Sequence, residues 1–447
     1  MADLVVIGGD AAGMSAASKA KRVDPSLDIV VFERGEWTSY GACGLPYYVK
    51  GEIESLDDLV AVTPEEFREH RDVDVRTETE AVEIDVDASE VAVEGPEGSY
   101  RESFDDLLIA TGARALEPPV EGLDLDGVHT FQSMDAGRAL KRDVERLDGD
   151  GVAGVVGGGY VGVELAEAFH ARGLDVCLFE MLPHVLAPFG EESARVVEDH
   201  LREHDVGLHL DTAVEALEGD GSVERVRTER DEFEVDVVVV GAGVVPNVEI
   251  AEQAGVETGE TGAIATDEYG ETSVDGVYAA GDCAESTHAV TGEVAHVPLA
   301  LTANRAGRAV GSTVAGEPTE TGEIAGTATL KAFDLEVART GLLEREASEA
   351  GFDVASVTVD VGSRAHYYPG GTEIQVTLTG DRDTGRLLGV SMVGREGVAH
   401  RVNSVATALH AGVTVEELES MDFAYAPPFS PVWDPVLTAA KVLGGEV

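Results

Sequence analysis

The feature that most limits the fold of this chain is a pattern that occurs twice. Residues 4–17 read LVVIGGDAAGMSAA, and residues 154–169 read GVVGGGYVGVELAEAF. Each segment predicts a buried strand, a glycine-rich turn and an amphipathic helix. A second apolar strand follows each copy and ends in an acid, at Glu33 in the first copy and at Glu180 in the second. The repeat predicts an α/β fold with two Rossmann-like dinucleotide-binding domains.

The residue types of the repeat have a physical reason. Glycines permit a tight turn and let the backbone approach a pyrophosphate, while the following helix offers free N–H groups and the positive end of its dipole. The acid accepts hydrogen bonds from ribose hydroxyl groups. Glycines that serve only tight turns are the alternative, and two complete copies disfavour it. Two dinucleotide sites in one chain indicate electron transfer between two cofactors.

Three further stretches have the pattern of a buried strand that enters a glycine turn: 105–114, 236–247 and 276–285. In the last of them, Asp282 stands just before an expected helix. Short apolar strands bounded by glycine predict parallel sheets with ligands at the strand C-termini. After about residue 322 the pattern changes to alternating, antiparallel strands, followed by an expected helix near residues 400–411. We expect a separate α+β unit there.

The chain is strongly acidic. Its 447 residues include 86 Asp and Glu against 31 Lys and Arg, for a formal net charge of −55. At molar salt the Debye length falls to roughly 3 Å and self-repulsion is screened, so we interpret the evenly spread acids as a halophilic adaptation to a salt-rich cytosol. An acidic face for a basic partner is the alternative. The balance excludes nucleic-acid binding, which needs clustered Lys and Arg.

Other bulk features concern the compartment. No apolar run is long enough to predict a membrane span, and the N-terminus has no cleavable-signal pattern. Three cysteines are too few for a disulfide framework, which favours a reducing, cytoplasmic location. No metal site is expected.

Seven motifs occur in an order that resembles one known family: GGDAAG, SYGACGLPYY, LLIATGAR, GGGYVGVE, VYAAGDCAE, HYYPG and YAPPFSPVWDP. The chain is similar to the FAD-dependent pyridine nucleotide–disulfide oxidoreductases, and within them to the single-cysteine branch of coenzyme A-disulfide reductases and NADH oxidases. The resemblance covers essentially the whole chain. It implies a homodimer and three domains: an FAD-binding domain at 1–112 and 248–322, an NAD(P)H-binding domain at 113–247 and a C-terminal α+β dimerisation domain at 323–447.

The same resemblance implies two cofactors, FAD and NADH. The residues that match the FAD site are Gly8, Gly13, Glu33, Thr111, Gly112 and Asp282, and those that match the nicotinamide nucleotide site are Gly157, Gly159, Gly162 and Glu180. No Arg or Lys follows Glu180 where it would bind a 2′-phosphate, and the acid itself repels that group. We therefore expect NADH, with NADPH less favoured.

Cys43 matches the redox nucleophile that lies beside the flavin in the family. Residues 41–48 (GACGLPYY) predict a turn that enters a helix, a position at which a cysteine has a lowered pKa. A buried structural cysteine is the alternative for an isolated Cys, and it is the interpretation we favour for Cys177 and Cys283. Dithiol relatives place a first cysteine five residues earlier. Here that residue is Thr38, so the partner sulfur must come from outside the chain.

The family's coenzyme A contacts match Ser15, Lys19, Arg22, Ser39, Ala42, Arg71 and His296. Coenzyme A carries phosphates, and Lys19 and Arg22 lie three residues apart on one face of an expected helix. A solvated helix surface is the alternative for these two cations.

The last matches to the family are tyrosines, and two residues of this chain differ from those of its relatives. Tyr425 and one of Tyr367 and Tyr368 match family tyrosines that approach the active site across the dimer, where a tyrosine can protonate a departing thiolate; interface packing is the alternative. Trp433 stands where coenzyme A reductases of the family can carry a lysine. Asp10 stands where peroxidase relatives and some oxidases keep a histidine.

We therefore expect a flavoenzyme that passes electrons from NADH through FAD to Cys43 and on to coenzyme A disulfide or a similar low-molecular-weight disulfide. The alternative is oxidation of NADH by O₂ through a Cys43 sulfenic acid, giving peroxide or water, which shares every cofactor motif. A flavin-containing redox sensor with little turnover is a third hypothesis. The intact Cys43 segment and both nucleotide motifs argue against that third hypothesis.

Overall fold

The N-terminal glycine pattern lies at the centre of the first sheet. In the computed structural model, which describes residues 1–447, β1 (Ala2–Ile7) pairs in parallel with β2 and with β6. The strand order is β3 (Asp74–Arg76), β2 (Ile29–Phe32), β1, β6 (Gly98–Ile109), β5 (Glu90–Gly95) and β4 (Glu80–Asp85), with β17 (Val277–Ala279) also paired to β6. Because β17 comes from much later in the chain, this unit is discontinuous in sequence.

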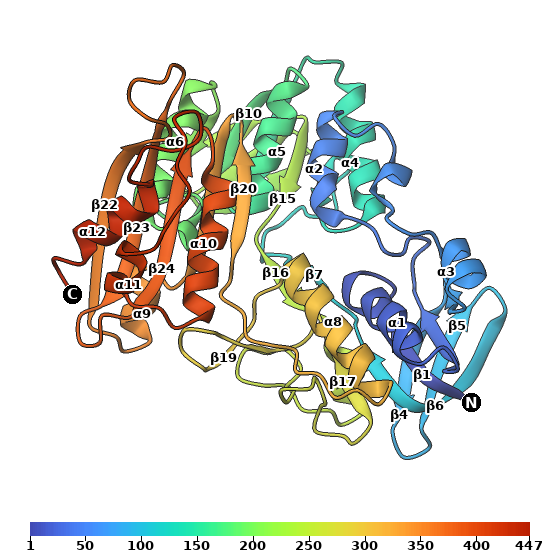
Figure 1. The fold of residues 1–447 in the computed structure, drawn as a ribbon. Coiled ribbons are helices and arrows are strands. Elements are labelled where there is room, and N and C mark those ends of the chain that lie inside the picture. The colour runs from blue at the N-terminus through green and yellow to red at the C-terminus, as the bar shows by residue number, and fades with distance from the viewer.

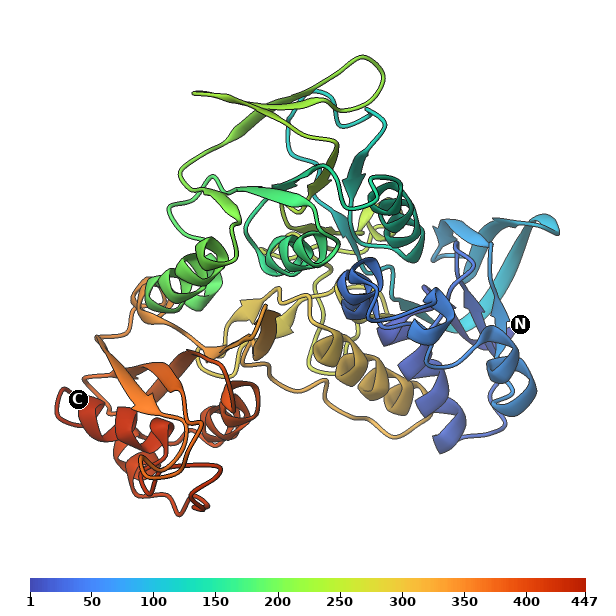
Figure 2. The same ribbon diagram turned by 90° about the horizontal axis from the view of Figure 1, so that it is seen from above.

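Alternate residues of β1 pack on opposite faces of this sheet, as a strand requires. Leu4 and Val6 pack in one core cluster with α1 (Ala11–Val23) and α8 (Ala300–Val314), whereas Val5 and Ile7 pack in another cluster with residues of β4 and β5. Helices α1 and α8 lie side by side, and α3 (Pro64–His70) lies near them (Figures 1 and 2).

The second copy of the pattern forms a second parallel sheet. Its strand order is β11 (Gly207–His209), β10 (Asp175–Phe179), β9 (Val152–Val156), β15 (Val237–Val240) and β8 (Val128–Thr130). Three helices belong to this unit: α4 (Met134–Arg146), α5 (Tyr160–Ala171) and α6 (Glu191–Glu203). Helix α5 follows β9 through the glycine turn, just as α1 follows β1.

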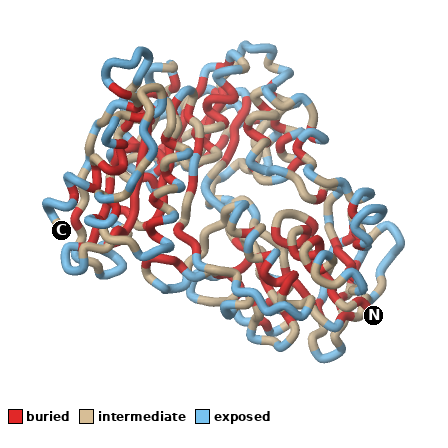
Figure 3. The backbone as a smooth tube through the Cα atoms, in the orientation of Figure 1, coloured by how far each residue is buried: buried red, intermediate tan, exposed pale blue.

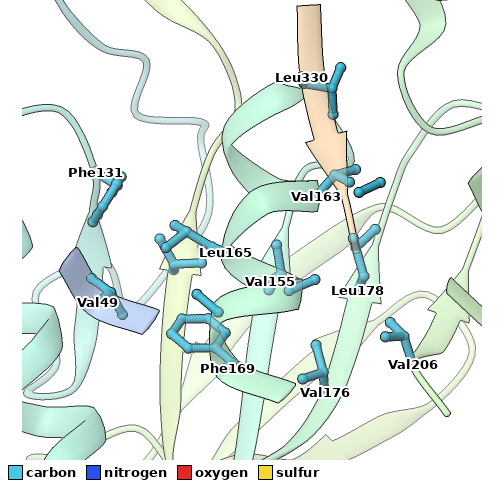
Figure 4. Close-up of a cluster of buried hydrophobic side chains, with 14 of the residues drawn as sticks. Val49, Phe131, Val155, Val163, Leu165, Phe169, Val176, Leu178, Val206 and Leu330 are labelled. Atoms are coloured by element: carbon cyan, nitrogen blue, oxygen red, sulfur yellow. The ribbon is translucent and has the colours of Figure 1, made fainter. Parts of the chain in front are cut away.

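One hydrophobic cluster joins three parts of the chain. Val155 of β9 and Phe169 of α5 pack in the same cluster as Val49 of α2 (Leu45–Lys50) and Leu330 of β20 (Ala328–Ala332) (Figure 4). The helix that follows Cys43 is therefore fixed against the second nucleotide unit by buried side chains. Figure 3 shows that buried backbone follows the sheets and the helices packed on them.

The last sheet is antiparallel, as the alternating pattern predicted. Its order is β20, β21 (Leu335–Gly341), β24 (Leu387–Gly394), β23 (Glu373–Asp381) and β22 (Val354–Gly362). The helix expected near residues 400–411 is α10 (Val398–His410). The unit also contains α9 (Glu344–Glu349), α11 (Val415–Glu419) and α12 (Pro435–Leu443). The predicted fold class, with α/β nucleotide units and an α+β C-terminal unit, is confirmed.

The remaining elements are short. They are β7 (Ala113–Ala115) paired with β16 (Val244–Pro246), β12 (Val214–Glu218) with β13 (Arg225–Thr228) and β14 (Glu232–Glu234), β18 (Ser286–Thr287) with β19 (Val294–Ala295), α7 (Glu249–Gln253), and 3₁₀ turns at Ala42–Gly44, Leu56–Leu59 and Ala187–Phe189. None of the helices has the length and apolar character needed to cross a bilayer.

The helix expected directly after Asp282 is absent. Residues 281–284 form a turn, and the next helix is α8, which begins at Ala300. The backbone of this segment pairs instead with Ile264, whose N–H donates to the Cys283 carbonyl at 2.8 Å and whose carbonyl accepts from Glu285 N–H at 3.0 Å. Backbone groups used in this pairing are not free for a helix.

Candidate active site

The first glycine turn admits no side chain at two positions. Gly8 has φ +110°, and a Cβ added there would lie 2.1 Å from the Ala110 carbonyl oxygen. A Cβ on Gly13 would lie 2.0 Å from the carbonyl oxygen of Gly8. Only glycine tolerates this φ without strain and leaves the backbone open to a ligand. The turn connects the end of β1 to the N-terminus of α1.

The second glycine turn repeats this geometry. Gly157 has φ +107°, and its added Cβ would lie 2.3 Å from the Gly241 carbonyl oxygen. An added Cβ on Gly162 would lie 1.9 Å from the Gly157 carbonyl oxygen, whereas Gly159 has open space around it. The two turns are therefore equivalent in backbone as well as in sequence, and each ends at the N-terminus of a helix.

The two acids hold equivalent places above these turns. Glu33 accepts hydrogen bonds from Gly9 N–H and Gly35 N–H, both at 2.8 Å. Glu180 accepts from Gly158 N–H at 2.7 Å and from Leu182 N–H at 2.8 Å. In both units, a carboxylate at the end of the second strand is thus held against the glycine turn.

The residues around the first turn fit a dinucleotide such as FAD. A cavity of about 220 Å³ is lined by Gly8, Glu33 and Thr111 among others. Beneath the turn, the Thr38 hydroxyl is fully buried and has no hydrogen-bond partner. An unpaired buried hydroxyl is costly. The Thr38 methyl carbon Cγ2 would lie 3.0 Å from a Cβ added to Gly9, so this side chain packs directly against the glycine turn. Gly112, next to Thr111, also has a positive φ, of +65°.

Cys43 lies in the 3₁₀ turn that precedes α2, and its side chain is exposed. Thr38, at the place of the first cysteine in dithiol relatives, is fully buried. Cys177 is half-buried within β10. Cys283 is fully buried and its thiol contacts the carbonyl oxygens of Ile109 and Ala280, each at 3.5 Å. Of the three cysteines, Cys43 alone offers an exposed thiol.

The expectation of a lowered pKa at Cys43 is wrong for the protein alone. Surrounding protein atoms desolvate the thiolate, and the nearby Glu164 carboxylate opposes a second negative charge, so the pKa of Cys43 is raised. Asp282 and Asp10 add to this effect at smaller magnitude. The sequence pattern showed a helix N-terminus but not the acids that the fold brings to it.

Two of these acids have unusual pKa values themselves. Burial raises the pKa of Asp10 to about 7, with Glu33 and Asp282 contributing in the same direction. Burial also raises the pKa of Glu164 to about 7. Both carboxyl groups are therefore partly protonated near neutral pH, which allows each to give or accept a proton close to Cys43.

Three of the predicted coenzyme A contacts form a cationic cluster. Lys19 and Arg22 lie on α1, and Arg71 follows α3 and donates to Ser18 of α1 at 2.9 Å. Burial, then the charges of Arg308 and Arg71, lower the pKa of Arg22. None of these cations has a carboxylate within 4.0 Å, although most other Lys and Arg side chains do.

Of the other predicted coenzyme A contacts, Ser15 lies within α1 and the rest lie near Cys43 or Asp282. Ser39 and Ala42 flank Cys43 in sequence, and His296 Nε2 lies 2.8 Å from the Asp282 carbonyl oxygen. Ser15 donates to Asn304 Oδ1 of α8 at 2.6 Å. Sequence reasoning did not select Asn304 or Arg308, because no local pattern shows that α8 packs beside α1.

The predicted tyrosines lie in the C-terminal unit. Tyr367 and Tyr425 share a hydrogen bond of 2.6 Å between their hydroxyl groups, and both rings are exposed. Within one chain, the hydrogen bond between these two hydroxyl groups is the only side-chain hydrogen bond of either tyrosine. Trp433 is also exposed, and Lys441 Nζ lies 5.3 Å from its ring centre.

Comparison with known proteins agrees with this geometry. The family model described as pyridine nucleotide-disulphide oxidoreductase matches residues 2–307, and the model of that family's dimerisation domain matches residues 327–435. The chain belongs to the pyridine nucleotide-disulphide oxidoreductase family. The resemblance seen in the motifs is thus confirmed, and so are the cofactors, since FAD is characteristic of this family and a nicotinamide nucleotide gives it its name.

Individual pyridine nucleotide-disulphide oxidoreductases resemble the whole chain. The NAD(P)H coenzyme A polysulfide/persulfide reductase of Pyrococcus horikoshii is 42% identical, with 98% of each chain covered. The NADH oxidase of Methanocaldococcus jannaschii is 35% identical, with 98% of this chain and 97% of that protein covered. The solved structure of an NAD-dependent persulfide reductase from A. fulgidus matches with a TM-score of 0.96 and 38% identity, covering 99% of this chain and 83% of that one.

Proposed function

We propose that this protein reduces the S–S bond of coenzyme A disulfide, or of a related coenzyme A persulfide or small disulfide, with electrons from NADH. The observation that carries this proposal is the cluster of Lys19, Arg22 and Arg71. In a chain with 86 acidic residues these three cations have no carboxylate partner, which suits a ligand that brings its own phosphates. The names of the relatives from P. horikoshii and A. fulgidus support the same substrate class.

Cys43 acts as the nucleophile in this proposal. Its thiolate attacks one sulfur of the substrate, the S–S bond breaks, and one coenzyme A leaves as a thiol after it takes a proton. The second coenzyme A stays on Cys43 as a mixed disulfide. When bound, FAD supplies the two electrons, taken from NADH, that reopen this bond and release the second thiol. The net reaction consumes one NADH, one proton and one disulfide, and yields NAD⁺ and two thiols.

The surrounding acids provide the protons that this reaction needs. Asp10 and Glu164, each with a pKa of about 7, lie near enough to Cys43 to influence the pKa of its thiol. A carboxyl group with a pKa near the working pH can donate a proton to a departing thiolate and then regain a proton from solvent. Both side chains belong to this chain, so the step needs no second subunit.

In this proposal the remaining site residues would take the roles that the family resemblance implies. Gly8, Gly13, Glu33, Thr111, Gly112 and Asp282 would hold FAD within the domain formed by residues 1–112 and 248–322. Gly157, Gly159, Gly162 and Glu180 would hold NADH within residues 113–247. Two copies would associate through residues 323–447, which bring Tyr425 and one of Tyr367 and Tyr368 to the partner's site. Ser15, Ser39, Ala42 and His296 would line the path of the coenzyme A arm.

Stopped-flow reoxidation tests the proposal. The enzyme is reduced anaerobically with NADH and mixed with coenzyme A disulfide or with O₂, while flavin absorbance is followed in the wild type and in Cys43→Ser. We expect coenzyme A disulfide to reoxidise the wild type faster than O₂ does. The Cys43→Ser variant should be reduced by NADH normally and should lose reoxidation by the disulfide. Equal disulfide rates in the two proteins would refute the role of Cys43.

Oxidation of NADH by O₂ is the second candidate function. The observation that favours it is the 35% identity to the M. jannaschii protein named NADH oxidase. In this case the first NADH would reduce O₂ to hydrogen peroxide, which would oxidise the Cys43 thiol to a sulfenic acid and leave as water. Two electrons and a proton from a second NADH, with one further proton, would return the sulfenic acid to the thiol and release a second water. Two results would favour this function over the first. O₂ would reoxidise the reduced enzyme faster than the disulfide does, and Cys43→Ser would no longer carry out the four-electron reduction of O₂ to water.

A further inference from the structure

Helix α8 runs parallel to α1 at very short range. A Cβ added to Gly307 would lie 2.1 Å from the Ala12 carbonyl oxygen, and one added to Gly311 would lie 2.3 Å from that of Ala16. Both pairs advance by four residues, so one turn of α8 follows one turn of α1 in the same direction. Figure 2 shows the two helices side by side. The missing side chains at both glycines are what allow this approach.

This parallel packing places Arg308 in the cationic cluster. The hydrogen bond from Ser15 to Asn304, of 2.6 Å, marks one exposed edge of the contact between the helices. One turn further along each helix, on the same side, stand Lys19 of α1 and Arg308 of α8. The lowered pKa of Arg22, to which the charge of Arg308 contributes, agrees with this placement.

Arg308 also has no carboxylate partner. Its side chain is exposed and makes no salt bridge or hydrogen bond within the chain. Four positive charges, on Lys19, Arg22, Arg71 and Arg308, thus have no carboxylate within 4.0 Å. Like charges held together repel, so the cluster favours an anion that carries several charges. A phosphate accepts two parallel hydrogen bonds from a guanidinium group, which a lysine cannot provide.

We propose that Arg308 binds the phosphate-bearing end of the coenzyme A substrate and makes the enzyme prefer phosphate-bearing disulfides over phosphate-free ones. This inference rests on the proposed function and adds a residue that the family motifs did not identify. The nucleotide end of the substrate would lie over the C-terminal half of α1, the middle of α8 and the end of α3, where the four cations stand. Its thiol arm would extend toward Cys43, at the N-terminal end of α1.

Kinetics with two disulfides test this role. Pantethine shares the thiol arm of coenzyme A disulfide and lacks its nucleotide and phosphates. In Arg308→Gln we expect KM for coenzyme A disulfide to rise by about tenfold, as for loss of one charge-assisted contact, with kcat unchanged. Neither KM nor kcat for pantethine should change. Arg305→Gln is the matched control, because Arg305 lies on the same helix and its guanidinium reaches the Glu323 carbonyl instead.

A binding experiment keeps the test independent of turnover. Calorimetric titration with adenosine 3′,5′-bisphosphate should show about tenfold weaker binding to Arg308→Gln than to the wild type or to Arg305→Gln. An unchanged Kd and an unchanged KM for coenzyme A disulfide in Arg308→Gln would overturn the inference. So would an equal rise of KM for pantethine. If the wild type does not reduce coenzyme A disulfide at all, the proposed function fails, and the titration still decides whether Arg308 binds phosphate.

Discussion

The Tyr47 hydroxyl donates a hydrogen bond of 3.0 Å to the Glu164 carboxylate. Tyr47 lies on α2, which begins directly after Cys43, and Glu164 lies in the first turns of α5, which begins at the second glycine turn. A second link joins the same helices, from Lys50 to Glu167 at 2.8 Å. The segment with the thiol is thus tied to the unit that contains the second glycine turn, and an acid is held close to the sulfur.

Replacing that acid should make the thiol more acidic. Glu164 is the charged group that raises the pKa of Cys43 most, so Glu164→Gln should lower this pKa. The measurement is the rate of alkylation by iodoacetamide as a function of pH, with Cys43→Ser as the background. We expect the midpoint of the profile to move to lower pH in Glu164→Gln. A midpoint that stays in place would show that Glu164 does not act on the thiol.

Asp10 should make stability depend on pH in the protein without cofactors. Its pKa is raised from 3.8 to about 7 in the folded state, so the folded state binds more protons than the unfolded state between these values. Stability from this group is therefore present at low pH and is lost as pH rises from about 4 to about 7. The change is worth at most about 4 kcal/mol.

The variant Asp10→Asn isolates this effect. It removes the titrating group while keeping the shape of the side chain and its contact with Tyr40 N–H. Urea denaturation at pH 5 and at pH 8, at fixed salt, should show a smaller loss of stability on raising the pH than in the wild type. If both proteins lose the same free energy of unfolding, the raised pKa of Asp10 is wrong.

Removal of Lys19 and Arg22 should weaken binding of coenzyme A disulfide without slowing the chemical step. Each charge-assisted contact contributes roughly 1.5–3 kcal/mol, so each alanine variant should raise KM about tenfold or more. Lys21→Ala is the control, because Lys21 lies between them in sequence and pairs with Asp72 at 2.7 Å. A decrease in kcat with unchanged KM would instead place these side chains near the reacting sulfurs.

Glu180 should decide between the two nicotinamide nucleotides. Its carboxylate is buried and held by two backbone N–H groups, where it can accept from ribose hydroxyls and repel a 2′-phosphate. The wild type should have a higher kcat/KM with NADH than with NADPH. Glu180→Ala should lose about tenfold in kcat/KM with NADH and should lose much less with NADPH. Equal kcat/KM for both nucleotides in the wild type would contradict this role.

The parts of the fold that could be predicted depend on local patterns. The turn after β1 needs a glycine at residue 8, and the turn after β9 needs one at residue 157. The local sequence therefore predicted where both glycine-turn units lie in the chain. The alternation of the last strands likewise predicted their antiparallel sheet. Arg308 could not be predicted, because its place beside Arg22 arises from two helices distant in sequence. The raised pKa of Cys43 depends in the same way on burial and on Glu164, which the fold brings from a segment distant in sequence.

Mass spectrometry of the Cys43 peptide tests the central claim most directly. The oxidised enzyme is first reduced with one equivalent of NADH, then mixed with excess coenzyme A disulfide, quenched in acid and digested. We expect a coenzyme A adduct on the peptide that contains Cys43, none on those with Cys177 or Cys283, and release of the adduct on further addition of NADH. An unmodified Cys43 peptide from an enzyme that still consumes the disulfide would contradict the claim.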